Sequence, residues 1–144
     1  MAQLKRIKYI SEFAHLMTPG DIDELVRNAA LKNKELDITG ILIASGHMFF
    51  QVIEGPGRHI DDLYEAIKND TRHTNMHLLN SEWGVTTRMF PDWSMKRINL
   101  DSESTARMEP LKAILEVIME SRCRVERLTG VLERAIWEKF ADAI

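Results

Sequence analysis

The chain has 144 residues, of which 44% are hydrophobic and 28% charged, a composition typical of one soluble globular domain. The net charge of −3 disfavours direct nucleic-acid binding, because contact with phosphates requires a basic surface. The single cysteine, Cys123, cannot form an internal disulfide. No signal peptide is recognisable at Met1–Arg6, and no apolar stretch approaches the ~18 residues of a membrane span. We therefore expect a cytoplasmic protein without membrane contact.

The N-terminal part of the chain predicts a strand and then a helix. Hydrophobic and polar residues alternate over Leu4–Ser11, which indicates a strand with Tyr9 on its apolar side. Thr18 is suited to cap a helix, with Pro19 at the first helical position and an acid three residues after the cap. Apolar residues then recur at helical spacing, and we expect the helix to end near Asn33.

Two strands, a second helix and two further strands follow. Asp37–Ala44 and Met48–Glu54 are apolar runs joined by a Ser-Gly turn, which predicts a hairpin. A second amphipathic helix, ending near Asn69, is indicated by Ile60, Leu63, Tyr64 and Ile67. His77–Val85 and Trp93–Asn99 are expected to be strands. The order β-α-β-β-α-β-β predicts an α+β fold with a ferredoxin-like sheet and two helices on one face.

From Ser102 onward the pattern is helical. Apolar residues over Leu111–Ile118 fit one helix, and those over Val125–Phe140 fit another. We expect this helical pair either to cover the second face of the sheet or to pack against a partner chain. The predicted division is therefore a domain at residues 1–100 and a C-terminal helical extension at residues 101–144.

Gln51 is a polar residue within the most apolar predicted strand. Because strand side chains alternate between faces, Gln51 shares a face with Phe49 and Ile53. A buried amide without partners costs about 1–3 kcal/mol, so the protein must supply a hydrogen-bond partner. The first and third strands of such a sheet usually lie side by side, which makes Tyr9 a candidate partner. We expect both side chains to meet in a pocket between the sheet and the two helices.

Several segments together resemble the BLUF family, sensors of blue light using a flavin. No one of them is specific, but all occur in order and at the family's spacing between Leu4 and Asn99. They are Arg6–Ser11, Asn33, Ile38–Leu42, Phe50–Pro56, Asp70–His73 and Arg88–Met95.

The resemblance implies that FAD, or alternatively FMN or riboflavin, binds between the two helices of the sheet domain. It implies that Tyr9 is the photochemical electron donor and that its proton moves through Gln51, which then rotates or tautomerises. Trp93 and Met95 match the pair that relays the signal through the last strand. The other residues expected to bind or contact the flavin are Asn33, Ile38, Phe49, Ile53, Asp70, Arg72 and His73.

Two positions depart from the family pattern. Family members often carry an arginine one residue before the asparagine at Asn33 or close to it, where this chain has the neighbours Lys32 and Lys34. Some carry an arginine on the second helix that pairs with the acid at Asp70, where this chain has Ala66. No metal site is expected, because His73 and His77 lack the further Cys or His ligands that a structural zinc requires.

The resemblance implies a photoreceptor rather than an enzyme. No cyclase, phosphodiesterase or kinase motif follows Asn99, so the output is expected on a separate downstream protein, such as an EAL-type phosphodiesterase, a transcription regulator or a response regulator. The C-terminal helices are expected to bind it or to form a homo-oligomer. An acyl-phosphate hydrolase of the same fold would need an arginine in the loop after the first strand, where Ser11–His15 has none. A small-ligand regulatory module or a non-photoactive flavin-binding protein remains the alternative.

Overall fold

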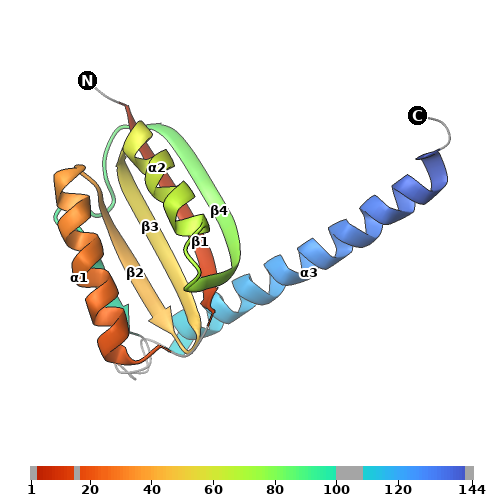
Figure 1. Cartoon of the computed structure of the whole chain (residues 1–144), viewed down its shortest axis with the longest axis horizontal. Helices are drawn as coiled ribbons and strands as arrows, with labels where there is room; N and C mark the ends of the chain where they lie inside the picture. The colour runs from red at the N-terminus through yellow and green to blue at the C-terminus, as the bar shows by residue number, and fades with distance from the viewer. Residues whose placement is uncertain (1–2, 15–16, 100–108, 142–144) are drawn as a thin grey trace.

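A five-stranded mixed sheet and three helices make up the fold (Figure 1). The structure is a computed structural model that describes residues 3–14, 17–99 and 109–141. The strand order is β4-β1-β3-β2-β5, with only the β2–β5 pair parallel among the described pairings. The elements are β1 (Leu4–Phe13), α1 (Pro19–Glu35), β2 (Thr39–Ser45), β3 (Met48–Pro56), α2 (Gly57–Lys68), β4 (His73–Val85), β5 (Lys96–Asn99) and α3 (Glu109–Phe140). The predicted α+β fold is confirmed.

The local sequence signals explain where most elements begin. Thr18 Oγ1 accepts from the Asp21 amide at 3.1 Å, and the Asp21 carboxylate accepts from the Thr18 amide at 3.0 Å. These two reciprocal hydrogen bonds form a capping box at the start of α1. β5 begins at Lys96 rather than at Trp93, and β4 begins four residues before the predicted start at His77. At Gly40, a Cβ would lie 2.1 Å from the Val52 carbonyl oxygen, so glycine permits the close approach of β2 to β3.

The two faces of the sheet have different cover. The inner face, which carries Tyr9 and Ile53, packs against α2, and the part around Leu42 packs against α1. The outer face, which carries Ile10, packs against the beginning of α3. Figure 1 shows α1 and α2 together on one side of the sheet and α3 leaving it at the other. The sheet therefore separates two cores, one beneath α1 and α2 and one beneath α3.

The predicted helical pair at the C-terminus is wrong, because α3 is one continuous helix of 32 residues. Leu115 and Met119 are buried against the outer face, whereas residues 124–140 are exposed except for Gly130. Because the apolar stripe changes side where α3 leaves the sheet, its sequence pattern imitates a break between two helices. The predicted domain boundary at residues 100 and 101 lies outside the described residues. No helix in the described ranges has the length and apolar character to cross a lipid bilayer.

Candidate functional site

Tyr9 and Gln51 face each other across neighbouring strands. They are direct partners in the antiparallel pairing of β1 with β3, and the Tyr9 hydroxyl donates a hydrogen bond to Gln51 Oε1. Tyr9 has 0% of its surface exposed and Gln51 has 8%. Burial, with smaller contributions from Tyr64 and Asp70, raises the pKa of Tyr9 above its ordinary value. The phenol therefore stays protonated through the physiological pH range, with its proton held toward Gln51.

The other end of the Gln51 amide contacts Met95. Gln51 Nε2 lies 3.7 Å from Met95 Sδ, a weak acceptor. Met95 comes from the segment just before β5, so the amide joins β1 to that segment through one side chain. The other member of the predicted relay pair lies elsewhere: Trp93 is 39% exposed and stacks on Phe90, with ring centroids 5.6 Å apart. Met95 therefore occupies the site, and Trp93 lies outside it.

A cavity of about 280 Å³ opens between α1, α2 and the inner face, and Tyr9, Gln51 and Met95 line it. Apolar residues of both helices form its walls, while polar side chains converge on the remainder. The apolar group is Leu25, Val26, Ala29, Leu63 and Ile67, and the polar group includes Asn33, Asp70, Arg72 and His73. The wall residues were not predicted as site residues, because helical spacing alone does not distinguish a core face from a cavity wall.

Asn33 connects α1 to the segment that carries Met95. It is buried, and its side-chain amide donates to the Ser94 carbonyl at 2.8 Å. Its own backbone carbonyl accepts from the Ile38 amide at 2.8 Å, which fixes the end of α1 against the start of β2. Lys32 and Ala66 also line the cavity. The two departures from the family pattern therefore lie at the cavity itself.

The carboxylate of Asp70 forms an ion pair with Arg72, which lies two residues later in the same loop. The Arg72 guanidinium donates to both carboxylate oxygens, at 3.0 and 3.1 Å from Nε and 2.6 Å from NH2. These hydrogen bonds lower the pKa of Asp70 to about 2. Arg72 thus provides the cationic partner that Ala66 cannot provide from α2.

His73 lines the cavity next to Tyr9. Its Nδ1 is 3.0 Å from the Ser11 hydroxyl, and its ring contacts those of Tyr9 and Phe49 at centroid distances of 6.4 and 5.4 Å. Burial lowers the pKa of His73, so the imidazole is neutral at physiological pH. His77 points instead to the outer face, where its Nδ1 lies 3.0 Å from Glu126 of α3.

Three predicted contact residues lie below the cavity rather than in its lining. Ile38, Phe49 and Ile53 are buried in the inner-face core, and the lining residues do not include them. They support Tyr9 and Gln51 from behind, since Ile38, Ile53 and Tyr9 belong to one cluster. A larger cavity of about 520 Å³, between the outer face and α3, has none of the predicted site residues in its lining.

The cavity suits a flat aromatic ring with one polar edge. Its volume is close to the lower limit of small-molecule sites, ~300 Å³, which is enough for the ring portion of a flavin nucleotide. Apolar side chains from α1 and α2 can cover the ring, and Asn33, Gln51 and Arg72 offer hydrogen bonds to polar edge atoms. The residues present therefore fit the predicted flavin.

Comparison with known proteins identifies the same family. The profile of the BLUF family, described as sensors of blue-light using FAD, matches residues 4–96. Subunit beta of the photoactivated adenylate cyclase of Euglena longa is 36% identical over 120 residues, which cover 82% of this chain and 14% of that protein. The chain thus spans only a small part of this relative's length.

Two solved structures extend the match to three dimensions. A bacterial light-regulated adenylyl cyclase superposes with a TM-score of 0.81 and 36% identity, over 86% of this chain and 36% of the cyclase. The dark-state structure of the BLUF protein BlrB superposes with a TM-score of 0.64 and 32% identity, over 84% of this chain and 98% of BlrB. The chain therefore belongs to the BLUF family of blue-light sensors, which use FAD as their cofactor.

Proposed function

We propose that this chain is a blue-light photoreceptor in which Tyr9 and Gln51 perform the primary switch and α3 carries the output. The observation that supports this most directly is the buried chain of contacts from the Tyr9 hydroxyl through the Gln51 amide to Met95, at the wall of a flavin-sized cavity. Bound FAD supplies the absorption of blue light and the oxidising power of the excited state. The remaining steps belong to the protein's own side chains.

Tyr9 is arranged to give up an electron and a proton together. Its ring lies in the cavity wall, and its hydroxyl donates directly to Gln51 Oε1. An oxidised tyrosine is a strong acid, so the proton leaves along the hydrogen bond that already exists. Because Tyr9 is fully buried, water does not compete for this proton. Gln51 is therefore the first group to respond.

Rotation of the Gln51 amide would change what Met95 contacts. In the arrangement seen, the amide oxygen faces Tyr9 and the NH2 group faces Met95 Sδ. After a half-turn the NH2 group would face Tyr9, and the amide oxygen would face the sulfur. A thioether cannot donate a hydrogen bond, so this contact would become unfavourable. A change in one buried hydrogen bond is worth about 1 kcal/mol, enough to shift a conformational equilibrium several-fold.

Displacement of Met95 has a short path to α3. Met95 directly precedes β5, which pairs with β2 at the edge of the sheet. Ile98 of β5 packs into the outer-face cluster with Leu115 and Met119 of α3. Only two residues thus separate Met95 at the switch from Ile98, which packs against α3. We propose that residues 1–100 form the flavin-binding domain and residues 101–144 the output extension.

An absorption spectrum tests the photoreceptor directly. The purified protein is expected to show a flavin spectrum that shifts to the red under blue light and recovers in the dark. Gln51→Leu is expected to retain flavin and lose the shift, and Tyr9→Phe to lose the light-adapted state. A colourless protein that cannot be reconstituted with FAD would refute the function. A normal photocycle in Tyr9→Phe would assign electron donation to another residue, such as Trp93.

The free part of α3 is proposed to pair with a second copy of this chain. Val125, Leu128, Leu132 and Ile136 recur at helical spacing along one side and are exposed. Most helical stability in proteins comes from packing an apolar face, and this face of α3 packs on nothing among the described residues. Each copy carries the same stripe, so a symmetric pair is self-complementary. Four basic and three acidic residues over positions 124–140 leave little net repulsion between copies.

The molar mass in solution tests this pairing. Wild type is expected to be a dimer by light scattering, and Leu128→Lys combined with Leu132→Lys is expected to be a monomer with an unchanged flavin spectrum. Arg127→Gln, an exposed neighbour of the stripe, is the matched control. A monomeric wild type would instead leave the stripe to a separate downstream protein, which by the sequence prediction would be a phosphodiesterase, a transcription regulator or a response regulator.

A further inference from the structure

The connection between β4 and β5 runs across one end of the sheet. β4 lies at one edge and β5 at the other, so residues 86–95 must pass the ends of β1, β3 and β2. This connection carries both Trp93 and Met95. Its attachment to the sheet therefore determines how far the segment around Met95 can move.

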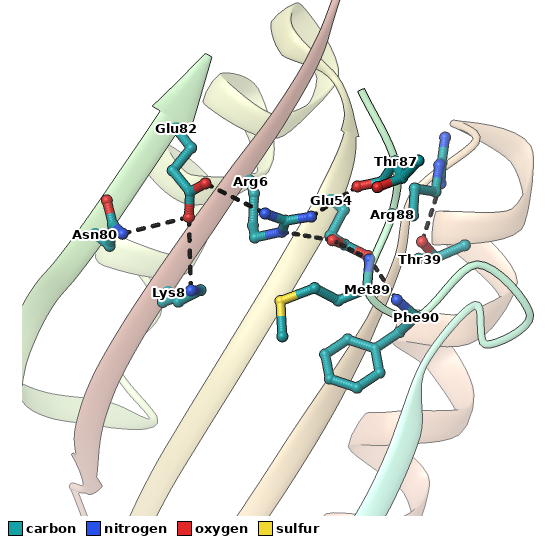
Figure 2. A network of polar contacts seen from close by, with 10 residues as sticks. All are labelled: Arg6, Lys8, Thr39, Glu54, Asn80, Glu82, Thr87, Arg88, Met89 and Phe90. Carbon is teal, nitrogen blue, oxygen red and sulfur yellow. Dashed lines mark hydrogen bonds and ion pairs between the residues drawn. The ribbon is translucent and has the colours of Figure 1, made fainter. Parts of the chain in front are cut away.

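Glu54 attaches the connection to β3. One carboxylate oxygen accepts from Arg6 Nε at 2.6 Å and from the Met89 amide at 2.8 Å, and the other accepts from the Phe90 amide at 2.9 Å (Figure 2). Glu54 is 1% exposed, so these bonds replace the hydration of its carboxylate. Gln51 lies three residues earlier on the same strand and points to the opposite face.

Arg6 extends this attachment to β1. It is the direct cross-strand partner of Glu54 on one side and of Glu82 on the other. Its guanidinium donates to the Thr87 carbonyl at 2.8 Å and to Glu82 at 3.2 Å. Figure 2 shows this row of side chains. Among the residues drawn, Lys8 contacts only Glu82, at the end of the row farthest from Glu54.

The connection is also held to β2 and to Asp37 just before it, through residues that precede and follow Met89 and Phe90. Arg88 donates to Thr39 Oγ1 at 3.0 Å and to the Asp37 carbonyl at 2.9 Å. The Gly40 amide donates to the Trp93 carbonyl at 2.8 Å. Buried ion pairs add little net stability over an apolar packing, so a buried Arg6–Glu54 pair is better explained by the geometry it imposes.

We infer that Glu54 is a positioning residue for the photocycle: it fixes the upstream end of the segment 91–95 and thereby sets the lifetime of the light-adapted state. The inference rests on the proposed function. With residues 89 and 90 held by Glu54, and the Trp93 carbonyl held by the Gly40 amide, displacement of Met95 strains a short stretch that is then driven back to its original place. With that end released, the displaced segment is less strained, and recovery in the dark slows.

Glu54→Gln tests this in the flavin-loaded full chain, since it keeps the shape and one acceptor oxygen but removes the charge. Arg6→Gln is the second variant, and Lys8→Gln is the matched control. Both test variants are expected to raise amide hydrogen exchange in the peptide containing Met89 and Phe90 at least tenfold in the dark. Both are also expected to slow dark recovery of the flavin absorption at least threefold, while Lys8→Gln changes neither.

Faster exchange with an unchanged recovery rate would overturn the inference and leave Glu54 a structural role only. Unchanged exchange would show that these hydrogen bonds do not hold the connection. A wild-type protein without a photocycle would refute the proposed function, and with it the role of Glu54 in the lifetime. The exchange measurement needs no light, so it still decides whether Glu54 holds residues 89 and 90.

Discussion

Replacing Gln51 by leucine leaves the buried Tyr9 hydroxyl without its acceptor. An unsatisfied buried hydroxyl costs about 1–3 kcal/mol of folding free energy, and Tyr9→Phe imposes a similar cost by leaving Gln51 Oε1 unpaired. When both partners become apolar, neither cost applies in full. The double variant is therefore expected to lose less stability than the sum of the two single losses, by about 1 kcal/mol or more.

Urea unfolding of all four proteins, followed by far-ultraviolet circular dichroism in the dark, measures this coupling. FAD must be held at one saturating concentration, because bound ligand adds to stability. Gln51→Leu with Tyr64→Phe is the control pair. The Tyr64 ring packs edge-to-face on Tyr9 with a centroid distance of 6.2 Å, but Tyr64 has no contact with Gln51 among the described hydrogen bonds. For this control pair, the losses of unfolding free energy of the two single variants should add up to the loss of the double variant within about 0.5 kcal/mol. Additive losses for Tyr9 and Gln51 would refute an energetic link between them.

Three further measurements follow from the geometry. Gly40→Ala places a Cβ 2.1 Å from a backbone oxygen, and the variant is expected to lose more than about 2 kcal/mol of unfolding free energy in urea. Gly130→Ala is the control, because a Cβ there meets open space, and it should gain up to about 1 kcal/mol. Equal effects of the two substitutions would contradict the close contact at Gly40. Asp70 titrates near pH 2 when folded and near 3.8 when unfolded, so its stabilisation is complete above pH 4 and lost as the pH falls to 2. Arg72→Gln should flatten stability in that window, and an unchanged profile would exclude the pairing. The imidazole of His73 should titrate below 6.5 by NMR, since burial disfavours its charged form; a higher value would contradict its buried, neutral state.

The pairing of Tyr9 with Gln51 was accessible from the sequence because alternation and strand order are strong constraints. Alternation places Gln51 on the apolar face of its strand, and the order of elements makes the first and third strands neighbours. The register that makes Tyr9 its direct partner follows from the hairpin and the core on that face. The capping residues at Thr18 predicted the start of α1 for a similarly local reason.

The arrangement of the C-terminal part could not be predicted in the same way. Nothing in the residues of α3 indicates where the sheet ends, and a stripe that changes side resembles two helices. The Arg6–Glu54 pair was also missed, since both residues alternate away from the pocket and their meeting depends on cross-strand register. Trp93 and Met95 are separated by one residue, Ser94, in the family motif, but only the route of their connection shows that Met95 enters the site while Trp93 stays outside.

In the first part of β3, alternate residues face the two sides of the sheet, one with the flavin-sized cavity and one with α3. Phe49 and Gln51 lie on the pocket side, while Met48 and Phe50 belong to the cluster beneath α3. Two sets of mutations can therefore be interleaved within one short stretch of the gene without touching the same surface. If α3 carries the output as proposed, a library that varies positions 48 and 50 together with α3 is expected to change the partner while the flavin absorption stays unchanged.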